Sequence, residues 1–397
     1  MRTHKGLIAA IGIAFLLQAC GSPESVETNS TSVIDTVPPV ATNPSATELA
    51  TNASTPAGEF FSTIPFRTGL GFRAPWFELY FIDPTNPFAQ REVGSVDANV
   101  AASIVAAKQS VDVSLRTLRL ESITDALIAV SERDIPVRVV VETDSLPNSP
   151  HIEALLAAGI PIVDDKQPGL LNGTFIVIDK SQVWTGSVDF DLAGVYRTYN
   201  AAVRINSAEV AADYTKEFEE MFLNNQFGKF VVPETPHPTV DIQGTQVEVL
   251  FSPDDLVLDR LTKLVSEAQQ SIYFLSHAFA SEDLGKTIRA KATEGVTVAG
   301  VLEFDQVDPT LADPESRAVA ELDLFREARL DIRLERGPEV MNHKIMIIDE
   351  KIVMLGSYDF TNRAENENDE NVLIIYDERV AQKFMEEFQR VQSRAQQ

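Results

Sequence analysis

The segment Asn342-His343-Lys344 places an imidazole beside an ammonium group, and Asp349 follows five residues after the lysine. A neutral imidazole can act as a nucleophile or a base near neutral pH. An ammonium group stabilises negative charge that develops on oxygen. A Gly-Ser-Tyr-Asp-Phe segment follows at residues 356–360 and adds a hydroxyl and a carboxylate. These residue types suit nucleophilic or acid-base chemistry on an anionic group.

The same set of residues occurs earlier in the chain, at an offset of 170 residues. Gly-Ser-Val-Asp-Phe at residues 186–190 matches residues 356–360, Asn172 matches Asn342, and Asp179 matches Asp349. In the middle of each unit the offset falls to 161, because each unit carries an insertion in a predicted loop. Such length changes cost little in a loop. The chain therefore contains two copies of one unit.

These motifs resemble the phospholipase D superfamily, which reads His-x-Lys-x4-Asp followed by Gly-Ser-x-Asn in each half. The resemblance spans both repeats, from about Phe77 to Val391. It implies a pseudo-twofold pair of domains with one site where the two motifs meet. One histidine would attack phosphorus, the other would protonate the leaving alcohol, and the lysines and asparagines would hold the phosphoryl oxygens. The resemblance implies no metal and no other cofactor.

The sequence departs from this pattern at the reacting groups. Lys344 stands at the second lysine position, but Asn342 stands at the histidine position before it. In the first repeat, Asn172 and Thr174 stand at the histidine and lysine positions.

The asparagines of the Gly-Ser-x-Asn motifs are replaced as well. Asp189 and Asp359 stand in their places, so the motif residues carry a formal charge of −1 instead of +2. If the two aspartates approach each other, they would share a proton or recruit a cation.

Three readings of this site stay open. In the first, the protein is an active phosphodiesterase in which His343 replaces the missing nucleophile. Neighbouring side chains on a strand point to opposite faces, so His343 would reach the site only through a bulge or a register shift. In the second, the protein is a pseudoenzyme that binds a ligand. In the third, Asn172, Asp189, Asn342 and Asp359 supply oxygen ligands to a hard cation.

Other motif residues have a structural and a functional reading. Ser187 and Ser357 lie in Gly-Ser turns and are either turn formers or donors to an oxyanion. Asp179 and Asp349 end predicted strands, which favours a structural role. Glu370 would orient the histidine of the second repeat, and Asn371 follows it, where the first repeat has Tyr199-Asn200. His277, at a predicted strand end, is a candidate displaced base, and the candidates for phosphate recognition are Arg116, Arg119 and Arg197.

The elements around these motifs alternate between strands and helices. Strands are predicted at residues 77–82, 110–115, 137–141, 175–178 and 183–185, and helices at 98–109, 122–131 and 208–222. Ser122 with Asp125 predicts a capping box at the start of the second helix. The β-branched run at 137–141, interrupted at Arg138, predicts a strand buried on both faces. The second unit repeats these elements, which predicts an α/β fold with two mixed sheets flanked by helices.

Composition limits the function classes. The 397 residues have a net charge of −26 and one cysteine. The acidic balance disfavours nonspecific binding to nucleic acid or anionic bilayers without excluding a local phosphate site. A single cysteine excludes an internal disulfide and a cysteine-rich zinc site.

The amino terminus resembles a bacterial lipoprotein signal. Basic residues precede an apolar run from Gly6 to Leu17, and Leu17-Gln18-Ala19-Cys20 resembles a lipobox. The run is too short to span a bilayer. We expect a signal peptide at 1–19 and lipidation at Cys20, which would hold an exported protein at the cell envelope. A tether rich in Ser, Thr and Pro would follow at 20–62, then repeats at 63–235 and 236–397.

The sequence thus leaves two functions open. One is a phospholipase D-like phosphodiesterase that hydrolyses or transfers the phosphodiester bonds of phospholipids, with nucleic acid as a less favoured substrate. The other is a noncatalytic envelope protein that uses the same fold to bind a ligand.

Overall fold

The computed structural model describes residues 60–230, 235–311 and 317–396. The expected signal peptide, Cys20 and most of the expected tether lie outside these residues. Within the described ranges, no helix has both the length and the apolar character needed to cross a membrane.

The first repeat is built on a mixed sheet. Its strands, in spatial order, are β1 (Ser62–Ile64), β2 (Gly69–Arg73), β3 (Phe77–Ile82), β9 (Thr198–Asn206), β8 (Gln182–Gly186), β7 (Phe175–Ile178), β4 (Val111–Leu115), β5 (Val137–Val141) and β6 (Ile162–Asp164). Strands β4, β5 and β6 are parallel, and the other neighbours are antiparallel.

The second repeat has the same order from β3 onward in equivalent strands. Its sheet runs β10 (Thr239–Ile242), β11 (Thr245–Ser252), β18 (Glu370–Tyr376), β17 (Ile352–Gly356), β16 (Lys344–Ile348), β12 (Ser271–Ser276), β13 (Thr297–Glu303) and β14 (Asp331–Glu335). The predicted α/β class with two mixed sheets is therefore confirmed. One short strand, β15 (Val340–Met341), leaves the second repeat and pairs with β9 of the first.

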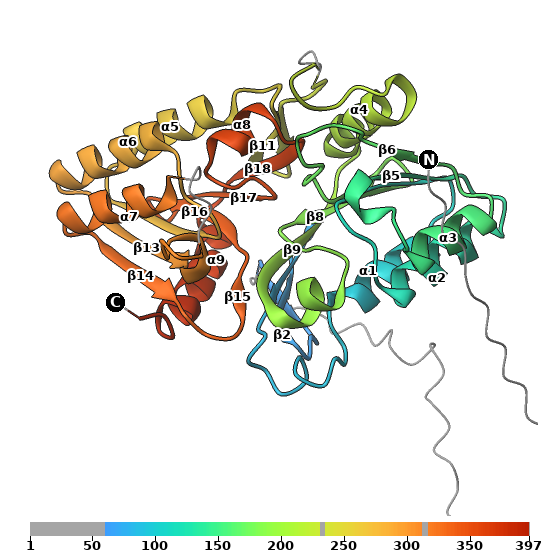
Figure 1. Ribbon diagram of the computed structural model, residues 1–397, viewed down its shortest axis with the longest axis horizontal. Coiled ribbons are helices and arrows are strands. Elements are labelled where there is room, and N and C mark those ends of the chain that lie inside the picture. Colours follow the sequence, from blue (N-terminus) through green and yellow to red (C-terminus); the bar gives the residue numbers. More distant parts are fainter. Residues whose placement is uncertain (1–59, 231–234, 312–316, 397) are drawn as a thin grey trace, which may run out of the picture. The chain divides into compact units, whose positions relative to one another are not determined.

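Helices cover the sheets in two groups (Figure 1). The first repeat contributes α1 (Val96–Val105), α2 (Glu121–Ser131), α3 (Pro150–Ala157) and α4 (Ala208–Asn224). The second contributes α5 (Val257–Glu267), α6 (Glu282–Thr293), α7 (Ala318–Glu327), α8 (Asn362–Asn366) and α9 (Glu378–Gln392). One apolar core lies within each repeat, and a third combines strands of both sheets with α4 and α9.

The predicted capping box at the start of α2 is wrong. The helix begins at Glu121, and Leu120 is the capping residue without a side-chain hydrogen bond. Ser122 is thus already inside the helix, and its hydroxyl donates to Asp97 Oδ2 of α1 at 2.8 Å. The hydroxyl ties two helices together instead of capping one.

The two closing helices each contact the other repeat. Tyr214 of α4 meets Phe251 of β11, with ring centroids 5.1 Å apart and planes at 81°. Phe384 of α9 meets Phe81 of β3 at 5.1 Å and 88°. These are equivalent contacts at the repeat offset, and edge-to-face packing of this kind adds to the stability from apolar burial. The helices thereby join the two repeats in one core.

Asp179 and Asp349 have the structural role that their positions favoured. Both follow buried strands with positive φ, at 52° and 53°. The carboxylate of Asp349 accepts from the backbone N–H groups of Gln269, Gln270 and Ser271 at 2.6–3.0 Å. The carboxylate of Asp179 accepts in the same way from residues 108–110. Each aspartate fixes the turn that leads into the central strand of its sheet.

The substitution Phe384→Ala tests the joint core. We expect it to lower the free energy of unfolding by about 3–5 kcal/mol, because it removes a fully buried ring and leaves a cavity between the repeats. Urea unfolding followed by circular dichroism measures the change. Leu223→Ala on α4 is the control, since Leu223 is 62% exposed. Equal losses in both variants would contradict a core shared by the repeats.

The substitution Asp349→Asn tests the carboxylate cap. Burial alone would raise the pKa of Asp349, but the N–H groups of residues 271, 269 and 270 outweigh it and lower the pKa. The charge therefore stabilises the folded state above the ordinary carboxyl pKa, and this contribution disappears as the pH falls through the lowered pKa. We expect a cost of about 1 kcal/mol at pH 7, at the low end because solvent screens the group.

Urea unfolding of both proteins between pH 7 and pH 3 measures this difference. The gap between parent and variant should close at the acidic end. Glu350→Gln is the matched control at the next, exposed residue. If the difference in unfolding free energy does not depend on pH, then the negative charge of Asp349 is not stabilised by the three N–H groups.

Candidate functional site

In each repeat, the segment that begins the motif, at Asn172 or Asn342, pairs with the backbone of the other repeat. The backbone N–H of Asn342 donates to the carbonyl of Tyr199 at 3.0 Å, next to the pairing of β15 with β9. The backbone N–H of Asn172 donates to the carbonyl of Asp369, also at 3.0 Å, and Leu171 forms a bridge with Asp369. These two arrangements are equivalent at the repeat offset. The site predicted at the junction of the motifs is therefore assembled by backbone pairing.

The asparagine side chains at the histidine positions also form hydrogen bonds to the other repeat. Asn172 Nδ2 donates to Glu370 Oε2 at 2.9 Å and to the carbonyl of Ser357 at 3.1 Å. Asn342 Nδ2 donates to Asn200 Oδ1 at 3.0 Å and to the carbonyl of Ser187 at 2.8 Å. Each repeat thus holds the first motif residue of the other.

These contacts correct two sequence expectations. Glu370 contacts Asn172 of the first repeat, whereas the family resemblance implied a contact with the histidine position of the second. The match of Tyr199-Asn200 with Glu370-Asn371 is also corrected: the offset of 170 pairs Asn200 with Glu370 and Tyr199 with Asp369, and the side chain of Asn200 contacts Asn342. The reason is that the segment at Asn172 pairs with Asp369 of the other repeat, which places its side chain next to Glu370. A motif within one repeat does not reveal a contact between repeats.

Glu370 is buried among polar groups. Burial raises the pKa of Glu370 to about 8, and hydrogen bonds from Ser357, Asn368 and Asn172 oppose the rise without cancelling it. Ser357 Oγ donates to Glu370 Oε2 at 2.6 Å and accepts from the N–H of Asn371.

The remaining hydroxyls and amides of the motifs are also occupied. Ser187 Oγ donates to Asn200 Oδ1 at 2.7 Å. Asn371 is fully buried, and its Oδ1 accepts from Thr185 and Tyr214. Ser187 and Ser357 therefore support the motif asparagines, and Asn371 joins the repeats.

Lys344 points into the junction. Its Nζ donates to Asn342 Oδ1 at 2.6 Å and lies 3.9 Å from Asp359 Oδ1. Asp189 lies 3.5 Å from the guanidinium of Arg116. Burial raises the pKa of Asp189, and Arg116 and Lys344 oppose this. Each aspartate thus faces a cation of the protein itself, an arrangement that does not favour the sequence-based reading of a metal at these residues.

A cavity of about 460 Å³ opens at this junction. Its lining includes the side chains Arg116, Asn172, His277, Arg317, Lys344, Asp359, Arg363 and Glu367. Four of these are cationic and two are acidic, so the charge of −1 that the motif residues alone carry does not describe the cavity. A small neighbouring pocket shares Arg116, Asn172 and Lys344 and adds Thr174, Ser187, Asp189, Asn342 and Ser357. The combined lining suits an anionic group.

His277 is the imidazole that reaches the cavity. It follows β12, and its ring Nδ1 lies 3.3 Å from the carbonyl of Met341. A carbonyl only accepts, so the proton is assigned to Nδ1, and Nε2 keeps its lone pair. Burial, followed by the charge of Lys344, lowers the pKa of His277 to about 4. The imidazole is therefore neutral at neutral pH.

His343, the nucleophile candidate of the sequence analysis, lies elsewhere. It is fully buried, its Nε2 lies 2.7 Å from Glu387 Oε1, and its ring meets Phe81 edge-on. It is not among the residues that line the cavity. No bulge or register shift brings it there, because the strand that starts at Lys344 sends adjacent side chains to opposite faces. His343 is therefore corrected from a catalytic to a core residue.

The sequence predicted only one of the three arginines that line the cavity. Arg116 was among the candidates, while Arg119 and Arg197 do not line the cavity, and Arg197 pairs with Glu92. Arg317 and Arg363 were missed. Arg363 follows the Gly-Ser-x-Asp segment by four residues, a spacing that could have drawn attention to it, whereas nothing marks Arg317.

Comparison with known proteins agrees with the geometry. The chain is 31% identical over 134 residues to human mitochondrial cardiolipin hydrolase, covering 34% of this chain and 50% of that protein. It is 23% identical over 146 residues to a phospholipase D of Rickettsia conorii, covering 37% of this chain and 69% of that protein. The chain thus spans about half the length of the mammalian hydrolases that it matches.

The fold is shared with a solved structure over most of its length. The crystal structure of phosphatidylserine synthase from Haemophilus influenzae superposes with a TM-score of 0.60 at 15% identity, covering 85% of this chain and 88% of that one. A family model described as "Cardiolipin synthase, PLD-like domain" matches residues 100–222 and 261–392. Since the two matched segments cover more than half of the chain and fall in both repeats, this protein belongs to the family of phospholipase D-like domains represented by cardiolipin synthase.

Proposed function

We propose that this protein is a phospholipase D-like phosphodiesterase that acts on the phosphodiester bonds of phospholipids at the cell envelope. One observation carries the proposal: a neutral imidazole, that of His277, shares a cavity with four cationic side chains. The cations suit the phosphate group of a phosphodiester, and the imidazole supplies a group that can accept a proton. Family membership supports phosphodiester chemistry as the reaction class.

The reaction follows from the positions of the titratable groups. Lys344 and Arg116 would neutralise the nonbridging oxygens and the charge that grows on them during attack. Water would attack phosphorus while its proton passes to Nε2 of His277. The bond from phosphorus to the alcohol oxygen would break, and the proton held on Nε2 of His277 would pass, through water in the cavity, to that oxygen. The products are an alcohol and a phosphomonoester.

A second candidate function is phosphodiester binding without turnover. Asn172 and Asn342 occupy both positions where the family resemblance places histidine, and an amide is neither a nucleophile nor a base at neutral pH. Both amides are also held in hydrogen bonds across the repeats. In this case the cavity would hold a headgroup and the fold would serve recognition alone.

The cellular setting is part of the same proposal. The lipobox-like segment that ends at Cys20 supports export and lipid attachment, and the tether after it would let the folded repeats reach a membrane surface. A substrate in the same membrane would then be presented at high local concentration. We therefore propose an envelope phospholipid as the substrate.

Removing the cavity groups tests catalysis. The full chain is assayed on vesicles of cardiolipin or phosphatidylcholine and on bis(p-nitrophenyl) phosphate. We expect Lys344→Ala to lower kcat/KM by about 100-fold or more, because a charge that stabilises the transition state is lost. We expect His277→Gln to lower it by about 100-fold, and activity of the parent to fall below pH 4 as the imidazole becomes protonated.

Two variants outside the cavity serve as controls. Lys351→Ala and His151→Gln remove the same functional groups at residues that do not line it, and both should keep the activity of the parent. If the parent shows no turnover but binds a phosphate ester, and Lys344→Ala loses that binding, the hydrolase proposal is wrong and the binding function is supported.

Restoring a histidine gives the complementary test. We expect Asn172→His to gain more phosphodiesterase activity than Asn342→His, because Glu370 already lies at the amide of Asn172 and would orient an imidazole there. At position 342 the equivalent partner is Asn200, which has no ionisable group to exchange a proton with an imidazole. The double variant Asn172→His with Glu370→Gln should lose most of the gain. Equal gains at both positions would contradict the orienting role of Glu370.

A further inference from the structure

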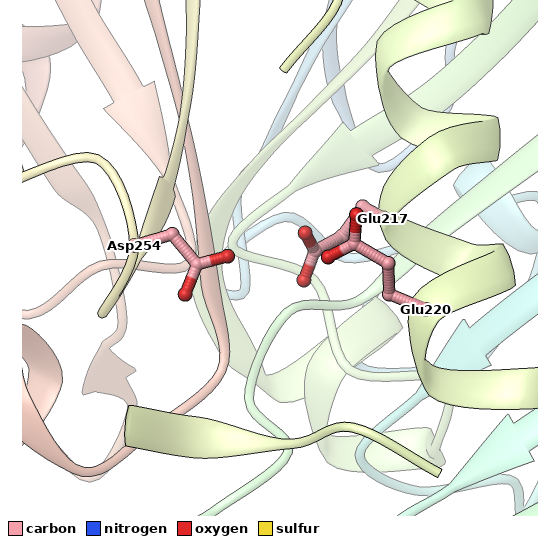
Figure 2. Close-up of side chains that lie close together, drawn as sticks. All are labelled: Glu217, Glu220 and Asp254. Carbon is pink, nitrogen blue, oxygen red and sulfur yellow. The ribbon is translucent and has the colours of Figure 1, made fainter. Parts of the chain in front are cut away.

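A separate acidic cluster lies where α4 of the first repeat meets the segment after β11 of the second. Figure 2 shows Glu217 and Glu220 on the helix with Asp254 facing them from the other side. One carboxylate oxygen of each lies within 4.8 Å of those of the other two. Both glutamates are buried, and Asp254 is partly buried. Three carboxylates at this spacing need a source of positive charge.

The other half of the molecule shows how the fold meets this need. At the repeat offset, Glu387 of α9 corresponds to Glu217, and Arg390 corresponds to Glu220. The guanidinium of Arg390 lies 2.5 Å from Glu387 Oε1 and 3.1 Å from Asp83 Oδ1, in the segment after β3. A cation of the protein therefore bridges α9 and the first repeat. In the cluster of Figure 2, a glutamate stands where this arginine stands.

Among the described residues that line the small cavity at this cluster, one is basic, Lys216. Lys216 pairs with Glu220 at 3.0 Å, one turn away on the same helix. Glu217, by contrast, has no hydrogen bond or ion pair to any residue in the described ranges. Burial first, and then Asp254 and other nearby carboxylates, raise the pKa of Glu217 well above its ordinary value.

A fourth carboxylate supplies an independent observation. Asp213, one turn before Glu217, is fully buried and lines the same small cavity as the three cluster residues. Its Oδ1 accepts from the N–H of His237 at 2.7 Å. Its Oδ2 is buried and has no hydrogen-bond partner among the described residues. A buried carboxylate oxygen without a partner is costly, and a cation in the cavity that Asp213 lines would offset that cost.

We propose that Glu217, Glu220 and Asp254, supported by Asp213, bind one Ca²⁺ ion that joins the two repeats. Calcium takes carboxylate oxygens at about 2.3–2.6 Å, so two oxygens on opposite sides of the ion can lie nearly 5 Å apart. Magnesium loses its bound water reluctantly and is rarely held by an all-protein set of ligands, so calcium is the expected occupant. The ion takes the place that Arg390 holds in the other half. This site lies apart from the cavity around Lys344 and does not depend on the proposed reaction.

Thermal unfolding of the full chain with CaCl₂, MgCl₂ or NaCl at matched ionic strength tests the site. We expect the Tm to rise by several degrees with Ca²⁺, in proportion to the logarithm of its concentration, and to change less with Mg²⁺. Isothermal titration calorimetry should give one Ca²⁺ per chain. Glu220→Gln and Asp254→Asn should each weaken binding by at least tenfold. Glu209→Gln, an exposed residue on the same helix, is the control and should keep the full response.

The substitution Glu220→Arg distinguishes an ion from simple charge removal. It copies Arg390 of the other half, so we expect the Ca²⁺-free variant to melt above the Ca²⁺-free parent and to show no further rise with calcium. Circular dichroism confirms that each variant is folded. A parent that neither binds Ca²⁺ nor melts at a higher temperature with it would overturn the proposal and leave protons as the neutralising species. An unchanged response in Glu220→Gln would place the ion elsewhere and overturn it as well.

Discussion

The crossing of segments between the repeats is the constraint on which the rest of the structure depends. Two backbone pairings, Asn342 with Tyr199 and Asn172 with Asp369, place the start of each motif strand on the other repeat. In the core, the rings of Tyr214 and Phe384 likewise each pack against a phenylalanine of the other repeat. Because these contacts are equivalent at the repeat offset, the two motifs meet at one axis and form a single cavity. Neither repeat could build the site alone, since the acceptors of each asparagine's amide nitrogen belong to the other.

Pseudo-symmetry also shows where the two halves have diverged. Positions away from the axis keep their roles, as the caps formed by Asp179 and Asp349 demonstrate. Two positions at contacts between the repeats do not: Glu370 is matched by Asn200, and Arg390 by Glu220. Each such difference changes the local charge by one or two units while leaving the backbone in place. The fold therefore tolerates changes in buried charge, provided that some other cation or proton compensates for it.

The sequence predicted the elements better than the site. The strands at 77–82 and 137–141 match the structure, because short segments dominated by apolar and β-branched residues are strong local signals. Side-chain alternation also indicated that His343 faces away from the site, although the sequence retained it as a candidate. The partner of Glu370 and the charge of the cavity could not be predicted, because they depend on segments from both repeats. Arg317 reaches the cavity from a loop without any motif, so its contribution has no local signal.

The cations of the cavity act on His277 in two opposing ways. They favour an anionic phosphate, but they also lower the basicity of the imidazole that would accept a proton. Burial is the larger cause of its low pKa, and the charges of Lys344 and Arg116 add to it. A bound phosphodiester would neutralise those charges and so remove the second cause while leaving the first. The imidazole would then become a stronger base when the substrate is present than in the free protein. Substrate binding and base strength are thereby coupled through the same two side chains, a coupling that a cavity used only for binding would not require.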